Sequence, residues 1–323
     1  MRISLERLRA EAAETGFRAE VLEKAIHLLG LLEALQSHPY LKPRLALKGG
    51  TALNLFIFDL PRLSVDIDLN YVGAQDREVM LGERPQVDTA IRAVCDREGY
   101  QVQRAPDEHA GGKWQLRYDG ALGQGGSVEV DLNYMLRVPL WPIVALNSAQ
   151  LGSYAARQIR VVDLHEIAAG KLCALLSRQA ARDLFDCHRL LTSGRLDLGR
   201  LRLAFVVYGG ANRRDWRTVS AEDVVFDGKE LQDSLIPMLR SGAMDGLGGI
   251  HDYARRLVAE CRQAMSSILP FSDDERAFLD ALLDHGEVRP ALLTPEEGLG
   301  ELISIHPALA WKALNVRQHM GIP

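Results

Sequence analysis

Cysteine is scarce in this chain and is not arranged for metal binding or cross-linking. The 323 residues include four cysteines, and no two of them form a CxxC pair. A zinc knuckle and a disulfide framework are therefore not indicated, and we expect reduced thiols in the core. The histidines form no HExxH or similar ligand spacing, so the sequence does not predict zinc chemistry. A GxSxG nucleophile motif is also missing.

Long apolar runs and an excess of positive charge are lacking too. No stretch reaches the roughly 18 apolar residues of a membrane span, and the N-terminal MRISLERLRAEAAETGF has no apolar signal region. We therefore expect no membrane association and a cytoplasmic location. The formal net charge of −5 argues against a broad coat of nucleic acid, although it leaves room for a local basic groove.

The first half of the chain mixes helices with strands. Residues 17–37 have helical spacing of apolar residues, and LALK is a short strand followed by two glycines and TALNLFIFD, a helix with Thr51 near its N-cap. LSVDIDLNYV predicts a strand and residues 83–99 a helix. YQVQRA, KWQLRYD and GSVEVDLNYML then alternate apolar and polar residues, which predicts an antiparallel meander. The expected fold class is α+β.

From about residue 163 the pattern becomes helical. Asp163 followed by Glu166 resembles a capping box that opens a helix over DLHEIAAGKLCALLSR. ARDLFDCHRLLTSG predicts a second helix ending at Gly194, and residues 272–286 predict a further one. The length predicts about two domains. We place them at residues 1–155 and 156–323, a bilobed arrangement with a mainly helical second lobe that closes over the active-site cleft.

Two acidic strands are near copies of each other, VDIDLNY at 65–71 and VEVDLNY at 128–134. Asp66 and Asp68 point to one face of their strand, where two carboxylates repel unless a cation lies between them. A solvated edge strand would explain one such pair, and a calcium loop would need a glycine where Tyr71 stands. A metal site explains both strands, with Asp66, Asp68 and Asp131 as ligands of Mg²⁺ or Mn²⁺. Glu129 shares the face of Asp131 and competes for the third position.

Gly49 and Gly50 lie between the first strand and its helix. Backbone N–H groups at such a turn point toward an anion, and a phosphate fits there. KGGT is not a Walker loop, because that motif places the lysine after the glycines. A plain tight turn is the alternative.

The order of these motifs resembles a known family. GGT, then hDhDh after a helix and a later h-D-h strand (h, apolar), is the pattern of the DNA polymerase β nucleotidyltransferase superfamily. LKGGTALNLF, PRLSVDIDLNY, HEIAAGKLCALLSR and ARDLFDCHRLL resemble, in this order, the AbiEii family of toxin nucleotidyltransferases, which includes the MenT toxins. The resemblance implies the toxin half of a type IV toxin–antitoxin pair with a cognate antitoxin. It also implies a polymerase-β-like first lobe and transfer of a nucleotide from an NTP to the acceptor end of tRNA.

Several residues match the motifs of that family. Gly50 and Thr51 match its Gly-Ser opening, and Asp66 and Asp68 match its metal-binding DxD. Lys171 matches the helix lysine, and Arg182, Asp183 and Asp186 match its RDxxD. The resemblance implies that Asp186 orients Lys171 or contacts the nucleotide, whereas helical spacing alone favours an exposed Arg182–Asp186 salt bridge and a solvated lysine.

Other polar residues are candidates for substrate contacts. Arg178 lies seven residues after Lys171 on the same helical face, so both cations are candidates for the β and γ phosphates. Arg62 and Ser64 are candidate phosphate or supporting contacts. Lys113 and Trp114 are candidates for RNA contact, although a half-buried sheet tryptophan is the simpler interpretation.

The predicted function is Mg²⁺-dependent transfer of NMP from an NTP to an RNA 3′ end, which blocks translation. Asp66, Asp68, Asp131, Lys171 and Asp186 are the predicted catalytic residues, and Asp131 is the candidate proton acceptor. Two alternatives stay open. One is nucleotidylation of a small molecule or a protein hydroxyl, and the other is a catalytically idle toxin–antitoxin binding partner.

Overall fold

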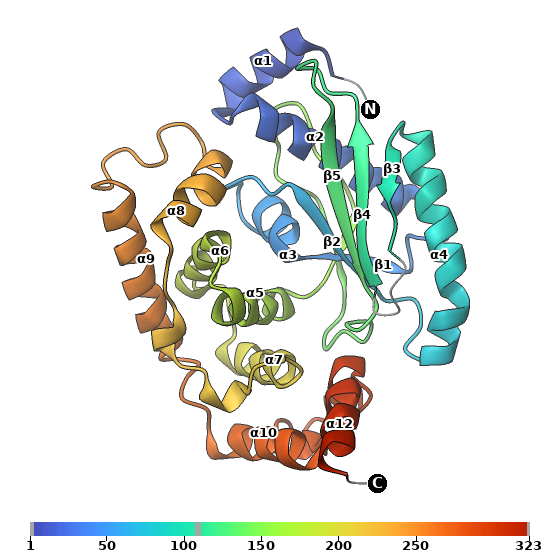
Figure 1. Cartoon of the computed structure of the whole chain (residues 1–323), viewed down its shortest axis with the longest axis vertical. Helices are drawn as coiled ribbons and strands as arrows, with labels where there is room; N and C mark the ends of the chain where they lie inside the picture. The colour runs from blue at the N-terminus through green and yellow to red at the C-terminus, as the bar shows by residue number, and fades with distance from the viewer. Residues whose placement is uncertain (1–2, 107–110, 322–323) are drawn as a thin grey trace. The chain divides into compact units, whose positions relative to one another are not determined.

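A computed structural model of the chain describes residues 3–106 and 111–321 (Figure 1). The chain forms two compact units. The sheet unit comprises Met1–Arg137, Pro142–Val162 and Ile236–Met244, and the helical unit comprises Val138–Trp141, Asp163–Leu235 and Asp245–Pro323. Within the described ranges, no helix is both long and apolar enough to cross a membrane.

A seven-stranded mixed sheet organises the sheet unit, in the order β3-β4-β5-β2-β1-β7-β6. The strands are β1 Leu45–Lys48, β2 Asp66–Tyr71, β3 Gln101–Arg104, β4 Gly111–Tyr118, β5 Gly126–Asn133, β6 Val144–Leu146 and β7 Ile159–Val161. β3, β4 and β5 pair antiparallel, which confirms the predicted meander. β2 pairs with β5 in parallel and with β1 antiparallel. The expected α+β class is confirmed.

The alternation of side chains gives this sheet one apolar face and one polar face. Along β5, Val128, Val130 and Leu132 are at most 1 % exposed, while Glu129 and Asp131 between them are half-buried on the other face. The apolar face packs against α2 (Ala19–Ser37), which contacts both β5 and β2. α4 (Arg77–Arg97) lies on the same side, where Arg92 approaches the ring of the buried Trp114. The polar face is therefore the one that can carry a site.

Three predicted features of the sheet unit need correction. α4 begins at Arg77 and not at residue 83, because Asp76 caps it by accepting from the N–H of Val79 and the helix continues through Pro85. Trp114 is 1 % exposed and belongs to the core, which excludes it as an RNA contact. Thr51 is not an N-cap, because the helical turn already begins at Gly49.

The helical unit contains the remaining long helices. They are α5 Leu164–Arg178, α6 Ala181–Thr192, α7 Leu198–Gly210, α9 Ile250–Met265, α10 Asp273–His285, α11 Glu297–Ser304 and α12 Pro307–Met320, with the short α8 at Gly228–Glu230. The predicted helices over 163–178, 181–194 and 272–286 are confirmed within two residues at each end. The sheet unit adds α1 Leu5–Thr15, α3 Gly49–Thr51 and a π-helical turn, Ala52–Ile57.

Glu166 does not complete the predicted capping box at the start of α5. Asp163 is the N-cap and accepts from the N–H of His165. Glu166 is instead buried, and its carboxylate accepts from the hydroxyl of Tyr208 (2.9 Å) and the N–H of Trp141 (3.2 Å). Burial raises the pKa of Glu166 to about 7, against the opposing effect of these hydrogen bonds. This carboxylate joins three segments of the helical unit.

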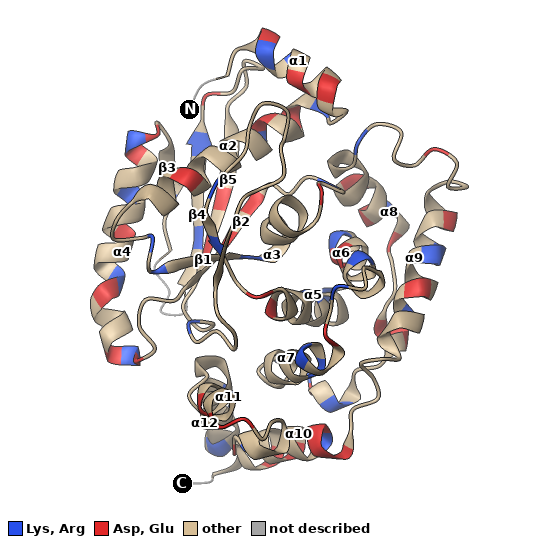
Figure 2. Ribbon diagram, turned by 180° about the vertical axis from the view of Figure 1, so that it is seen from behind, with Lys and Arg blue, Asp and Glu red and all other residues tan. Residues whose placement is uncertain are grey.

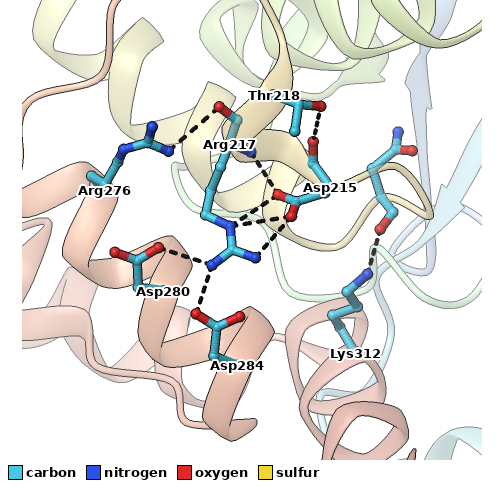
Figure 3. A network of polar contacts seen from close by, with 8 residues as sticks. Asp215, Arg217, Thr218, Arg276, Asp280, Asp284 and Lys312 are labelled. Atoms are coloured by element: carbon cyan, nitrogen blue, oxygen red, sulfur yellow. Dashed lines mark hydrogen bonds and ion pairs between the residues drawn. The ribbon is translucent and has the colours of Figure 1, made fainter.

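Ion pairs join α10 to the loop that follows α7 (Figure 3). The guanidinium of Arg217 contacts Asp215, Asp280 (3.0 Å) and Asp284 (2.6 Å). Beside it, Lys312 of α12 donates to the carbonyl of Asn212 (2.8 Å). The carboxylates of this network are more than 40 % exposed, so each pair adds well under about 1 kcal/mol and the network orders the loop more than it stabilises the unit.

Candidate functional site

The turn after β1 is built around Gly49. Its φ of +72° lies in the left-handed region that glycine tolerates. A Cβ at this position would lie 2.0 Å from Oδ2 of Asp68, so the Asp68 carboxylate occupies the space that the missing side chain leaves. The local sequence therefore brings the glycine turn against one of the two predicted acidic strands.

Thr51 connects the same turn to the same strand. Its hydroxyl donates to the backbone carbonyl of Asp66 at 2.5 Å, and the side chain is fully buried. In this geometry Thr51 holds the first helical turn against the start of β2. The carboxylates of Asp66 and Asp68 are thereby placed at a fixed position relative to Gly49 and Gly50.

The two near-copy strands lie side by side. β2 and β5 pair in parallel with Asp66 opposite Glu129 and Asp68 opposite Asp131. Residues opposite each other in a ladder share a face, so the four carboxylates form one acidic patch. Figure 2 shows the acidic segments on both strands. The expected pairing of Asp131 with Asp68 is confirmed.

Two lysines flank the Asp68–Asp131 pair. β1 places Lys48 opposite Asp68, and β4 places Lys113 opposite Asp131, so a row Lys48, Asp68, Asp131, Lys113 crosses four strands. The amine of Lys113 lies 2.9 Å from Glu129, which makes an ion pair its observed role. Sequence reasoning missed Lys48, although its position directly before the glycine pair was a usable signal.

The environments of Glu129 and Asp131 differ. The hydrogen bond from Lys113 lowers the pKa of Glu129. Burial raises the pKa of Asp131, and the neighbouring Asp68 adds to the rise while Lys48 and Lys113 oppose it. A carboxylate with a raised pKa is the better proton acceptor, and Glu129 is already neutralised by a lysine.

The donor set on this face suits a hard divalent cation. Mg²⁺ is usually held by one or two carboxylates together with substrate phosphates and water, and not by a full protein cage. Asp68 and Asp131 offer such a pair, with Asp66 on the same face. Among the residues that the structure describes, no group of three or more His, Cys, Asp or Glu is placed to hold a metal by itself. The residues present fit Mg²⁺ or Mn²⁺ bound together with a polyphosphate.

Two further candidates lie in the segment before β2. Arg62 is 2 % exposed and its guanidinium donates to the carbonyl of Leu63 at 2.8 Å. Ser64 is also buried. Arg62 supports the local backbone in this geometry, and a contact of either residue with phosphate stays a prediction.

The helical unit gathers the other predicted residues around Lys171. Its amine lies 3.0 Å from Asp183 and 2.8 Å from Asp186, and Arg178 contacts Asp183 at 2.7 Å. Both aspartates are 1 % exposed. Burial raises the pKa of Asp183, but Lys171 and Arg178 outweigh it and hold that pKa below its usual value. Asp186 is therefore not the partner of an exposed surface salt bridge, and its contact with Lys171 is the one that the family motif implies.

Arg182 precedes Asp183 on α6 and is half-buried. Its predicted contact with a phosphate remains untested. Two cations therefore contact one pair of buried carboxylates: Lys171 contacts Asp183 and Asp186, and Arg178 contacts Asp183.

A family model and a solved structure both match the chain. The family model described as "Nucleotidyl transferase AbiEii toxin, Type IV TA system" matches residues 30–284. The structure is similar to that of MenT4, a nucleotidyltransferase toxin from Mycobacterium tuberculosis H37Rv, with a TM-score of 0.55 and 18 % sequence identity. That match covers 93 % of this chain and 98 % of MenT4, and at this identity it supports the fold alone. No curated protein matches the sequence.

Proposed function

Because the chain belongs to the AbiEii family of nucleotidyltransferase toxins of type IV toxin–antitoxin systems, we propose that it transfers NMP from an NTP to an RNA 3′ end. The tRNA acceptor stem is the proposed acceptor, and blocked translation is the proposed result. The observation that carries this proposal is the in-register pair Asp68 and Asp131, with Gly49 packed against Asp68. NTP and tRNA are cytoplasmic substrates, so the proposed location of the protein is the cytoplasm.

In the proposed reaction the RNA 3′ oxygen attacks the α-phosphorus of the NTP. A new O–P bond forms, the bond to the pyrophosphate oxygen breaks, and the leaving oxygen takes the electron pair. Asp131 accepts the hydroxyl proton, because Glu129 on the same strand face is already paired with Lys113 at 2.9 Å. A divalent cation bound by Asp66, Asp68 and Asp131 would lower the pKa of the hydroxyl and stabilise the leaving oxygen.

Other residues would hold the triphosphate. The backbone N–H groups of Gly49 and Gly50, with the hydroxyl of Thr51 as a supporting group, are the proposed phosphate contacts of the sheet unit. We assign Lys171, positioned by Asp186, and the neighbouring Arg178 and Arg182 to charge neutralisation of the pyrophosphate. This assignment rests on the family match and on the buried ion pairs.

The direct test incubates purified protein with Mg²⁺, total tRNA and each of the four labelled NTPs in turn. Label should enter RNA with at least one NTP, and Asp66→Ala or Asp68→Ala protein should lose the transfer. Asp96→Ala removes an exposed carboxylate of α4 and is the matched control. Undiminished transfer by the Asp68→Ala protein would contradict the proposal. Label in protein or in a small product would favour a different acceptor.

The family description names a toxin–antitoxin system, so a cognate antitoxin is part of the proposal. It would antagonise the toxin in cells. A catalytically idle partner remains the rival, and the same assay separates them because an idle protein incorporates no label into any acceptor.

A further inference from the structure

A groove lies on the polar face of the sheet next to the acidic patch. It has a volume of about 330 Å³, and its polar lining includes Gln103, Gln115, Arg117, Ser127 and Glu129. This volume is within the range of roughly 300–1,000 Å³ that is typical of ligand sites. All of these residues belong to the sheet unit.

The strand register connects the groove to the acidic patch. Gln115 lies opposite Glu129, and Arg117 lies opposite Ser127, on the same face as Asp131. Moving along β5 from Asp131, one therefore passes Glu129 and then Ser127, a rise of roughly 13 Å at about 3.3 Å per residue. The groove therefore adjoins the acidic patch at Glu129.

The sheet order fixes which side of the carboxylates the groove occupies. The glycine turn leaves the end of β1, and the order β1-β2-β5-β4 places β2 and β5 between that turn and β4. A triphosphate bound at the turn would lie on the β1 side, with the carboxylates next to it. The groove, on β4 and β5, lies on the opposite side.

Arg117 gives the groove its charge. Among the residues that the structure describes, its side chain makes no hydrogen bond or ion pair, and its guanidinium lies next to Gly125. A Cβ at Gly125 would lie 2.9 Å from Nε of Arg117, so a larger residue there would displace the guanidinium. Glu129, the acidic group of the lining, is already paired with Lys113 at 2.9 Å. The groove therefore offers one cation and two amides. Its carboxylate, Glu129, is neutralised by Lys113 and also accepts from the amide of Gln115 at 3.5 Å.

We propose that this groove binds the terminal nucleotides of the acceptor RNA, with Arg117 on a phosphate and the amides of Gln103 and Gln115 on base or ribose edges. The inference rests on the proposed function. The attacking hydroxyl must reach the carboxylates from the side away from the triphosphate, and the groove is a polar cavity on that side. A guanidinium suits phosphate, and amides suit the donor and acceptor groups of an unpaired nucleotide.

The test measures both substrates separately. Arg117→Ala should raise KM for tRNA about 10-fold, as expected for loss of one charge-assisted hydrogen bond at an exposed site. KM for the NTP and kcat at saturating tRNA should stay unchanged, and Arg117→Lys should recover part of the loss. Arg97→Ala is the matched control, because it removes an arginine that is 55 % exposed from α4, on the opposite side of the sheet.

A second readout does not depend on turnover. In an Asp68→Asn background, which is expected to be inactive, Arg117→Ala should weaken tRNA binding about 10-fold and reduce the slope of log Kd against log salt concentration by about 1. Gln115→Ala should weaken tRNA binding without changing that slope.

Two results would overturn the inference alone. Wild-type protein that labels tRNA, together with an Arg117→Ala protein of unchanged KM for tRNA, would show that the groove is not used by the acceptor. A rise in KM for the NTP with an unchanged KM for tRNA would assign the groove to the nucleotide. Wild-type protein that labels no RNA at all would instead overturn the proposed function, and this inference with it.

Discussion

Replacing Gly49 by alanine perturbs the contact on which the proposed site depends. The new Cβ would lie 2.0 Å from Oδ2, 2.8 Å from Cγ and 2.9 Å from Cβ of Asp68. A Cβ essentially never lies closer than 3.0 Å to a non-bonded heavy atom, so the turn and the carboxylate must separate by about 1 Å. Rotation of the Asp68 side chain moves the oxygen but leaves its Cβ close, so relaxation changes the position of the carboxylate relative to the glycine turn.

The expected costs differ for folding and for activity. Alanine at a φ of +72° costs about 1–2 kcal/mol in backbone strain, which a protein of this size tolerates. A displacement of about 1 Å at a catalytic group costs on the order of 100-fold in rate. Gly49→Ala should therefore fold, unfold at slightly lower denaturant concentration, and transfer nucleotide about 100-fold more slowly.

Gly99 provides the matched control. Its φ of +81° imposes the same backbone strain, but no atom lies within 4 Å of a Cβ built there. Gly99→Ala should lose a similar amount of stability in urea denaturation and keep the transfer rate measured with labelled NTP. Wild-type transfer by the Gly49→Ala protein would refute the argument that this glycine positions Asp68. Equal loss of transfer in both variants would attribute the effect to strain.

Three further predictions follow from the buried charges and the acidic patch. Lys171→Met removes the cation between two buried aspartates and should lower the free energy of unfolding of the helical unit by about 3–5 kcal/mol. Arg178→Met, at a side chain that is 66 % exposed, should cost less than about 1 kcal/mol in the same urea titration. The pKa of Glu166 is raised from 4.5 to about 7, so its protonated form stabilises the native state fully below about pH 4.5 and this contribution is lost as the pH rises through 7. Relative to the Glu166→Gln protein, the free energy of unfolding of the wild type should fall by about 3 kcal/mol between pH 5 and pH 8. Denaturant titrations at several pH values across that range measure this difference. Expression of the wild type should slow cell growth, whereas Asp68→Ala at equal protein level should not.

Each of these has a clear contrary outcome. Equal destabilisation by Lys171→Met and Arg178→Met would mean that burial of the pair does not control its contribution. A constant difference between wild type and Glu166→Gln across the pH range would show that the carboxyl does not titrate there. Growth inhibition by Asp68→Ala would separate toxicity from nucleotide transfer.

The acidic strands could be predicted because the information is local. Alternation of apolar and acidic residues defines the faces of β2 and β5, and the near-identical VDIDLNY and VEVDLNY predicted their pairing with Asp68 beside Asp131. The helices around Lys171 follow from periodicity in the same way. The family motif, and not the spacing, indicated that Asp186 contacts Lys171.

Other contacts between distant segments could not be predicted. Lys48 joins the row only because β1 pairs antiparallel with β2, which a short strand of four residues does not specify. Glu166 was assigned to a capping box because its spacing from Asp163 fits one, but partners 25 and 42 residues away bind its carboxylate instead. The groove beside Arg117 is lined by Gly125 and Gly126 at the start of β5 and by Gln103 at the bulge that shifts the β3–β4 register, and neither feature has a distinctive sequence pattern.

Binding of Mn²⁺ in the presence of a non-hydrolysable NTP analogue tests the central claim most directly, because it does not require the RNA acceptor. Titration of the wild type, followed by electron paramagnetic resonance, should show Mn²⁺ bound with the analogue, and Asp68→Asn and Asp131→Asn should each weaken that binding at least about 10-fold. Glu129→Gln, in the same sheet and already paired with Lys113, should leave it nearly unchanged. Equal Mn²⁺ affinity in the wild type and in Asp68→Asn would contradict the assignment of these carboxylates to a metal-dependent nucleotidyltransferase site.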